Sequence, residues 1–72
     1  MRIENSKDLA QVSRERRALL GLTQQELADL AGVSARTIYQ LETGESAITF
    51  GRLLLVTKTL GLALKLDLAT HE

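Results

Sequence analysis

Side chains that could do chemistry are few in this 72-residue chain. It has no cysteine, and its one histidine, His71, is the second-last residue, so we expect no zinc, heme or other cofactor. No activated nucleophile or glycine-rich phosphate loop is visible, and we expect no enzyme activity. The remaining candidates can bind: Arg36 and Gln40 lie four residues apart, opposite Ile38 on a predicted helix. Alone, such residues are ordinary solvated positions.

The elements that would position these two side chains lie within residues 23–42, TQQELADLAGVSARTIYQLE. Thr23 and Glu26 have the spacing of a capping box at a helix start. Gly32 stands where a helix end needs a left-handed residue, and Ser34 can cap the next helix, predicted at about residues 35–42. Apolar residues at helical spacing predict the buried faces; they are Leu27, Ala28, Leu30 and Ala31 in the first helix, and Ile38 and Leu41 in the second.

This stretch resembles the helix-turn-helix of the Cro/C1-type (XRE) repressor family. The matching residues are Thr23-Gln24, Glu26-Leu27-Ala28, Gly32-Val33-Ser34, Thr37-Ile38, Leu41-Glu42 and Gly44. The resemblance extends over about residues 9–68. Residues 14–17, residues 21–24 and residues 60–66 look like the HipB branch, whose members are antitoxins and autorepressors paired with HipA-type kinases. The resemblance implies an all-α fold, a compact four- to five-helix lambda-repressor-like DNA-binding domain.

In such a domain the helix at residues 35–42 enters the major groove of double-stranded DNA, where Arg36 could pair with guanine and Gln40 with adenine. Bases or a thymine methyl could be touched by Ser34, Ala35 and Thr37. Phosphates could be held by Gln24, Tyr39, Thr43, Thr49 and Arg52. Alternatives remain open: Ser34 as only a cap, Thr37 as packing, Tyr39 as plain surface, and Arg52 in either role.

Arg17 and Glu42 match a polar pair of the family. There a basic residue four positions before this glycine, here Gly21, pairs with the glutamate that ends the recognition helix. We therefore expect a structural ion pair that fixes the first helix against the third. The alternative is two solvated charges, which would contribute little to stability.

The charge balance argues against strong binding to nucleic acid, because nine basic residues are matched by nine acidic ones. Distribution matters more than the sum, and the helical part of the chain carries Arg14, Arg16, Arg17, Arg36, Arg52 and Lys58. Glu45 follows Gly44 where many relatives carry a lysine. We expect modest non-specific affinity and a strong dependence on dimerisation.

Two further helices complete the predicted body. The first runs over about residues 7–20 with Ser6 as its cap, and its apolar face is thin because Ser13 and Arg16 interrupt it; that face consists of Leu9, Val12 and Leu20. The last runs over about residues 50–60 from Thr49 to Gly61. It would cover the bundle with Phe50, Leu53, Leu54, Val56, Thr57 and Leu60.

Residues 62–68 change to a period of two, which fits a half-buried strand. The alternating apolar residues are Leu62, Leu64, Leu66 and Leu68. No second strand of similar quality exists in the chain, so the economical partner is the same strand of another copy. We therefore expect a homodimer with this segment as its interface.

The length predicts a single helix-turn-helix domain over residues 1–72, with a helical body at 7–61 and a dimerisation strand at 62–68. No apolar run is long enough to cross a membrane and no secretory signal is visible. We therefore expect a cytoplasmic, nucleoid-associated protein.

Three functions remain. The first is a sequence-specific repressor that binds an inverted-repeat operator, as the HipB-like antitoxin of a toxin–antitoxin pair with a possible HipA-like kinase partner. The second is a stand-alone regulator of the same type without a toxin partner. The third is a protein-interaction module that kept the fold but has little DNA affinity, which the zero net charge and Glu45 would favour.

Overall fold

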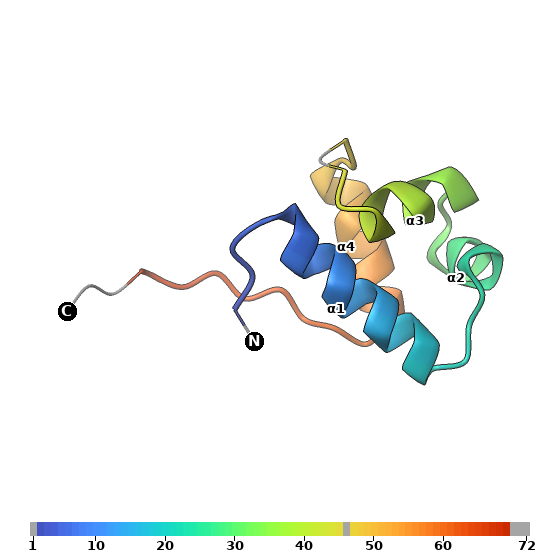
Figure 1. The fold of residues 1–72 in the computed structure, drawn as a ribbon, viewed down its shortest axis with the longest axis horizontal. Coiled ribbons are helices and arrows are strands. Elements are labelled where there is room, and N and C mark those ends of the chain that lie inside the picture. Colours follow the sequence, from blue (N-terminus) through green and yellow to red (C-terminus); the bar gives the residue numbers. More distant parts are fainter. Residues whose placement is uncertain (1, 46, 70–72) are drawn as a thin grey trace.

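The arrangement of helices follows the predicted all-α pattern. The computed structural model describes residues 2–45 and 47–69, so Met1, Ser46 and residues 70–72, with His71 among them, lie outside the described part. Within it the chain forms α1 (Ser6–Leu19), α2 (Gln24–Ala31), α3 (Ala35–Glu42) and α4 (Phe50–Thr59). Helix α3 packs against α1 and α2, and α4 packs against α2 (Figure 1).

The helix starts are set by local hydrogen bonds. Thr23 and Glu26 form the predicted capping box, with Glu26 N–H donating to Thr23 Oγ1 at 3.0 Å and Thr23 N–H to Glu26 Oε1 at 2.9 Å. Ser34 caps α3 and Thr49 caps α4 as expected. The cap of α1 is a correction: Asn5, not Ser6, has extended backbone angles and accepts the N–H of Asp8 at 2.9 Å. Asparagine is as good a cap as serine, so the sequence offered two adjacent candidates.

Three of the four helices end in the same hydrogen-bond pattern, whereas α2 ends with the N–H of Gly32 donating to the carbonyl of Ala28. At the end of α4, Gly61 has φ +74°, its N–H donates to the carbonyl of Lys58, and the N–H of Leu62 donates to Thr57. This is a Schellman motif, which satisfies two carbonyls that the helix itself leaves open. The same pair of bonds ends α1 at Gly21 and α3 at Gly44.

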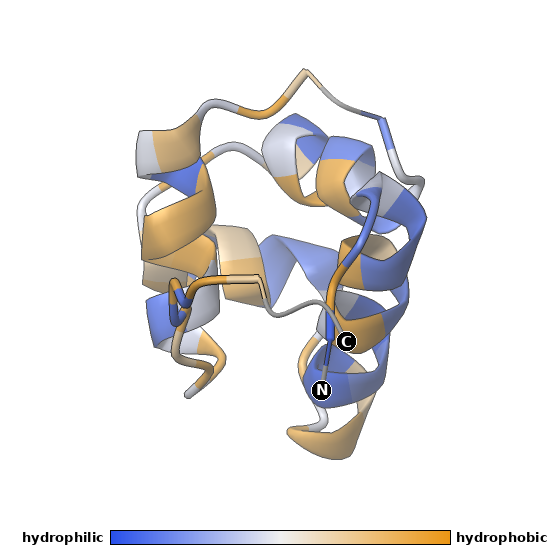
Figure 2. Ribbon diagram, turned by 90° about the vertical axis from the view of Figure 1, so that its left-hand side faces the viewer, coloured by the Kyte–Doolittle hydropathy of each residue, from blue (hydrophilic) through white to orange (hydrophobic). Residues whose placement is uncertain are grey.

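A small aliphatic core joins α2, α3 and α4. It consists of Leu27, Ala28, Ala31, Ile38, Leu41, Val56 and Leu60. Helix α1 adds the buried residues Ala10 and Ser13. Figure 2 shows that hydrophobic residues recur along the helices and also run along the C-terminal segment.

Several leucines and the phenylalanine predicted to be buried are exposed. Leu30 is 66% exposed, because it lies about 100° around α2 from the centre of the face formed by Leu27, Ala28 and Ala31. Phe50 is exposed because it starts α4 one turn before the first residue of that helix that packs on the core. Large exposed fractions are also found for Leu20 and Leu54.

Residues 62–69 leave the helical body as a single extended segment (Figure 1). Leu62 still packs against the core, whereas Leu64, Leu66 and Leu68 are exposed. The predicted strand is not present among the described residues, because a strand is defined by a ladder and this part of the chain offers no partner. The pairing of this segment therefore stays a prediction.

The helices of the described residues are short compared with the width of a membrane. None of these helices is both long enough and apolar enough to cross a bilayer.

Candidate nucleic-acid interface

Helix α3 divides its side chains between the core and the solvent. Ile38 and Leu41 are buried, whereas Arg36 and Tyr39 are exposed and Gln40 is partly exposed. The buried pair lies one turn apart, which fixes the rotation of the helix about its own axis. The remaining face, with its arginine and glutamine, is therefore presented outward in one orientation.

Several of the residues predicted to bind DNA line one shallow groove. Ser34, Arg36 and Gln40 line it from the α3 side, and Arg52 lines it from α4. Its other lining residues are Gly32, Val33, Thr37 and Ala47. Arg52, which the sequence left undecided, thus lies beside the outward face of α3 although 16 residues separate it from Arg36. Two guanidinium groups and an amide at one groove suit a partner with phosphate and hydrogen-bonding groups.

The residues at the start of α3 support the helix more than they offer contacts. The Ser34 hydroxyl accepts the Thr37 N–H at 3.1 Å and lies 3.0 Å from the Thr37 hydroxyl. Thr37 is only 6% exposed, and Ala35 is partly buried against the core. This burial favours the packing role of Thr37 that the sequence left open, and its base contact stays a prediction.

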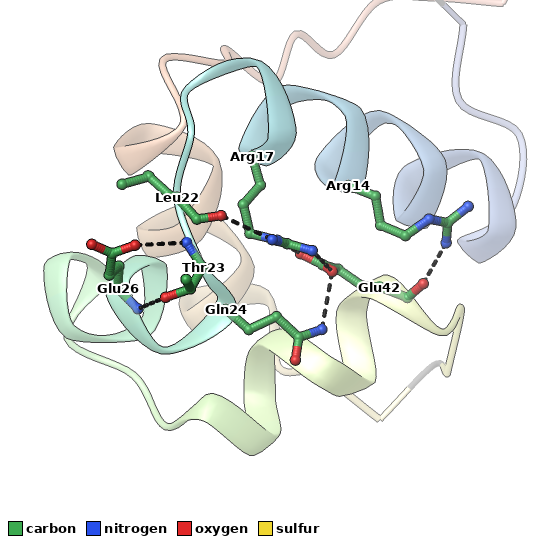
Figure 3. A network of polar contacts seen from close by, with 7 residues as sticks. All are labelled: Arg14, Arg17, Leu22, Thr23, Gln24, Glu26 and Glu42. Carbon is green, nitrogen blue, oxygen red and sulfur yellow. Dashed lines mark hydrogen bonds and ion pairs between the residues drawn. The ribbon is translucent and has the colours of Figure 1, made fainter.

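Arg17 and Glu42 form the predicted ion pair, and the pair is bidentate (Figure 3). Arg17 Nε donates to Glu42 Oε2 at 2.6 Å and Arg17 Nη2 to Glu42 Oε1 at 2.8 Å. The exposed fractions of the two side chains are 21% and 3%, so the carboxylate is nearly removed from water. The hydrogen bond to Glu42 raises the pKa of the Arg17 guanidinium above its ordinary value, while burial acts in the opposite direction.

The same network extends to α2. Gln24 Nε2 donates to Glu42 Oε1 at 3.1 Å, and Arg17 Nη1 donates to the carbonyl of Leu22 at 2.9 Å (Figure 3). In this chain the amide of Gln24, which was predicted to touch phosphate, also holds the carboxylate of Glu42 at the end of α3. A phosphate contact from this residue would use its second amide hydrogen or its backbone N–H in the first turn of α2.

Arg14 and Arg16 have roles that the sequence reasoning missed. Arg14 Nη1 donates to the carbonyl of Glu42 at the end of α3, and Arg16 Nε donates to the carbonyl of Leu60 at 2.8 Å. Both bonds span more than two dozen residues of sequence, and no local signal identifies the carbonyl that a given arginine will reach. The arginines of α1 thus bond to groups of this chain, which lowers the number of arginines available for phosphate.

The loop after α3 carries the remaining candidates. Thr43 Oγ1 donates to the carbonyl of Gln40 at 3.2 Å and lies 3.4 Å from Glu45 Oε1. Thr49 Oγ1 accepts the N–H of Arg52 at 3.3 Å as the cap of α4. A carboxylate beside Thr43 disfavours phosphate at that position. The groove between α3 and α4 is therefore the better candidate for contact with DNA.

The described residues contain no cluster of acidic or histidine side chains that could hold a metal ion. An outward helix after a capped helix and a glycine turn, with an arginine-lined groove beside it, defines a helix-turn-helix DNA-binding protein. The chain belongs to the helix-turn-helix family of the Cro/C1 (XRE) type, whose family model matches residues 14–66. It is a DNA-binding regulator of that type.

Solved structures of DNA-binding regulators share most or nearly all of this fold. A chain of the HipA–HipB–O2–O3 complex is 26% identical, with a TM-score of 0.86 over 97% of this chain and 99% of that chain. HipB in complex with the O4 20mer is 27% identical, with a TM-score of 0.85 over the same shares of the two chains. The restriction–modification controller protein C.AhdI from Aeromonas hydrophila is 26% identical, with a TM-score of 0.73 over 81% of this chain and 88% of that one. No curated protein matches the chain at a significant level.

Proposed function

We propose that this regulator is a sequence-specific repressor that binds an inverted-repeat operator as a homodimer. The observation that carries the proposal is the outward face of α3, where Arg36 and Gln40 share a groove with Arg52. In this proposal Arg36 reads guanine and Gln40 reads adenine in the major groove, while Arg52 meets a phosphate. The fixed rotation of α3 supports it, because base readout requires a helix held in one orientation.

The dimer would be made by the C-terminal segment. Residues 7–61 form the DNA-binding body of the single domain, and residues 62–68 form the strand that pairs with the same strand of a second copy. The support is a run of exposed leucines, Leu64, Leu66 and Leu68, on a segment that has no ladder partner among the described residues. A two-fold axis would set two copies of α3 about 34 Å apart, one turn of DNA.

The more specific proposal is an antitoxin that represses its own operon and binds a HipA-type kinase. It is supported by the fold shared with a chain of the HipA–HipB–O2–O3 complex along nearly its full length. An adjacent gene for such a kinase, and a stable complex of the two purified proteins, are the expected results. If no kinase gene is adjacent and no complex forms, the protein is a stand-alone regulator. The similarity to the controller protein C.AhdI supports that second reading.

Mobility shifts on the DNA upstream of the protein's own gene, measured over a series of salt concentrations, test the DNA-binding proposal. We expect a complex on one inverted repeat that is at least about a thousandfold tighter than on unrelated DNA. A shallow salt slope is expected, because the arginines of α1 are engaged in internal hydrogen bonds. Equal and weak binding to every sequence would favour the protein-interaction module instead.

A further inference from the structure

Arg16 lies at the point where the C-terminal segment leaves the helical body. The Schellman motif at the end of α4 satisfies the carbonyls of Thr57 and Lys58 but leaves that of Leu60 open. Arg16 Nε, from α1, donates to this carbonyl at 2.8 Å. Leu60 itself is fully buried, so its open carbonyl would otherwise lack a partner in a poorly hydrated position.

The guanidinium also limits the space beside the turn. A Cβ added at Gly61 would be 3.2 Å from Arg16 Nη2, closer than ordinary packing distance. Gly61 has φ +74° and is the residue at which the chain changes from helix to extended segment. Arg16 therefore bonds to the helix side of this change of direction, and its Nη2 leaves little room for a side chain at the glycine.

A related arrangement occurs at the end of α3, one carbonyl earlier relative to the glycine: Glu42 lies two residues before Gly44, whereas Leu60 directly precedes Gly61. There the Schellman bonds engage Leu41 and Gln40, and Arg14 donates to the next carbonyl, that of Glu42. Two arginines two positions apart on α1 thus hold the end of the recognition helix and the start of the C-terminal segment. A cation near a helix C-terminus is favoured by the helix dipole as well as by the hydrogen bond.

We propose that Arg16 is a positioning residue that sets the direction in which residues 62–69 leave the helical body. Helix α1 also bonds to the end of α3 through Arg14. The direction of the C-terminal segment and the position of the recognition helix are therefore both set relative to α1. One consequence rests on the proposed function. If the segment pairs two copies in a homodimer, Arg16 sets the distance between the two recognition helices. Operator spacing is then determined in part by a residue that touches neither DNA nor the second copy.

The direct test needs no DNA. The chain lacks cysteine, so spin labels can be placed at Asp29→Cys on α2 and Lys65→Cys on the segment, both at exposed positions. Labelled protein diluted in unlabelled protein reports the distance within one chain by electron–electron double resonance. We expect a single narrow distribution for the parent and a shifted or clearly broader one for Arg16→Ala.

Lys58→Ala is the matched control, because it removes an exposed positive charge from the last turn of α4 without touching the Leu60 carbonyl. Its distance distribution should equal that of the parent. Arg16→Lys keeps the charge and most of the stem but loses the Nε donor, so it should broaden the distribution as well. It also serves as the test if Arg16→Ala does not fold by circular dichroism. Distributions that stay unchanged in the folded Arg16 variants would overturn the proposal.

Operator duplexes with altered spacing then test the consequence. The parent should lose about tenfold in affinity when the spacer between half-sites changes by one base pair, and Arg16→Ala should lose only about threefold or prefer another spacer. A merely structural loss would weaken binding to all spacers equally. If the parent binds no operator while the label distances still respond to Arg16, the proposed function fails and the positioning role stands.

Discussion

The helix-turn-helix stretch, residues 23–42, and the C-terminal segment, residues 62–69, are built in opposite ways. The first contains its own caps, its own turn glycine and leucines that meet the core within twenty residues of sequence. The second has alternating leucines that are mostly exposed and no ladder within the described residues. The difference teaches that the recognition element is complete within one chain, whereas the segment has the composition of a structure that needs a second chain.

The largest effect is expected from charges placed on the segment. Leu64→Lys with Leu66→Lys should give a monomer with an intact helical body, because two ammonium groups cannot be buried in an apolar seam. Operator affinity should fall by about 10²–10⁴, since the second half-site contact is no longer linked to the first. Sedimentation velocity at micromolar concentration and binding to the full operator measure both quantities.

The control for that variant places the same charges on the other face. Ala63→Lys with Ala69→Lys adds two lysines to the same segment, at positions that alternate with the leucines and so lie on the opposite face of an extended chain. It should remain dimeric. A parent that is already a monomer, or a leucine variant that stays a dimer, would remove the segment from the interface.

The next largest effect is expected at the ion pair that joins the helix-turn-helix stretch to α1. Arg17→Ala or Glu42→Gln should lower the free energy of unfolding by about 3–5 kcal/mol, because each leaves a buried polar group without its partner. A double-mutant cycle in thermal or urea unfolding measures the coupling. The exposed pair Arg2–Glu4, 4.0 Å apart, is the comparison, and Arg2→Ala should change stability by less than about 1 kcal/mol. A coupling of zero between Arg17 and Glu42 would contradict a structural role.

Within the recognition helix, the effect of Arg36→Ala should be smaller and should concern specificity. We expect a loss of about 1–3 kcal/mol in operator binding, with relaxed preference at one base pair in each half-site. Lys58→Ala removes an equal charge outside the groove and should leave the base preference unchanged. If Arg36→Ala weakens binding to all sequences alike, then this arginine contacts phosphate.

The smallest expected effects are the changes in stability when either of two serines in the helical body is replaced by alanine. Ser13 is fully buried and its hydroxyl has no hydrogen-bond partner among the described residues, so Ser13→Ala should raise the melting temperature by several degrees, corresponding to about 1 kcal/mol. Ser34 caps α3, and Ser34→Ala should lower stability by about 0.5–2 kcal/mol. Calorimetry of the two variants should show opposite signs. A destabilised Ser13→Ala would mean that the hydroxyl is satisfied in solution.

The sequence predicted the elements that depend on neighbouring residues. Thr23, Ser34 and Thr49 cap helices as expected, and Gly32 and Gly61 end them. It erred where several side chains compete for one role. Asn5 replaced Ser6 as a cap, and Leu30 and Phe50 face solvent because a pattern of leucines does not say which of them a neighbouring helix will cover.

The candidate site was predictable in part. Arg36 and Gln40 could be placed on the outward face of α3 because the buried positions of Ile38 and Leu41 fix the rotation of the helix. The position of Arg52 in the same groove, and the hydrogen bond of Gln24 to Glu42, depend on how separate helices meet. Neither could be derived from spacing within one element.

What the sequence determined by itself is therefore the local structure, since caps, turns and amphipathic faces act over a few residues. It also indicated the Arg17–Glu42 pair, through a family resemblance rather than through spacing. Only the tertiary structure decided the roles of Arg14 and Arg16, which reach carbonyls at the ends of α3 and α4. The physical reason is that an arginine can satisfy any open carbonyl within its reach, and packing of the helices alone determines which carbonyl that is.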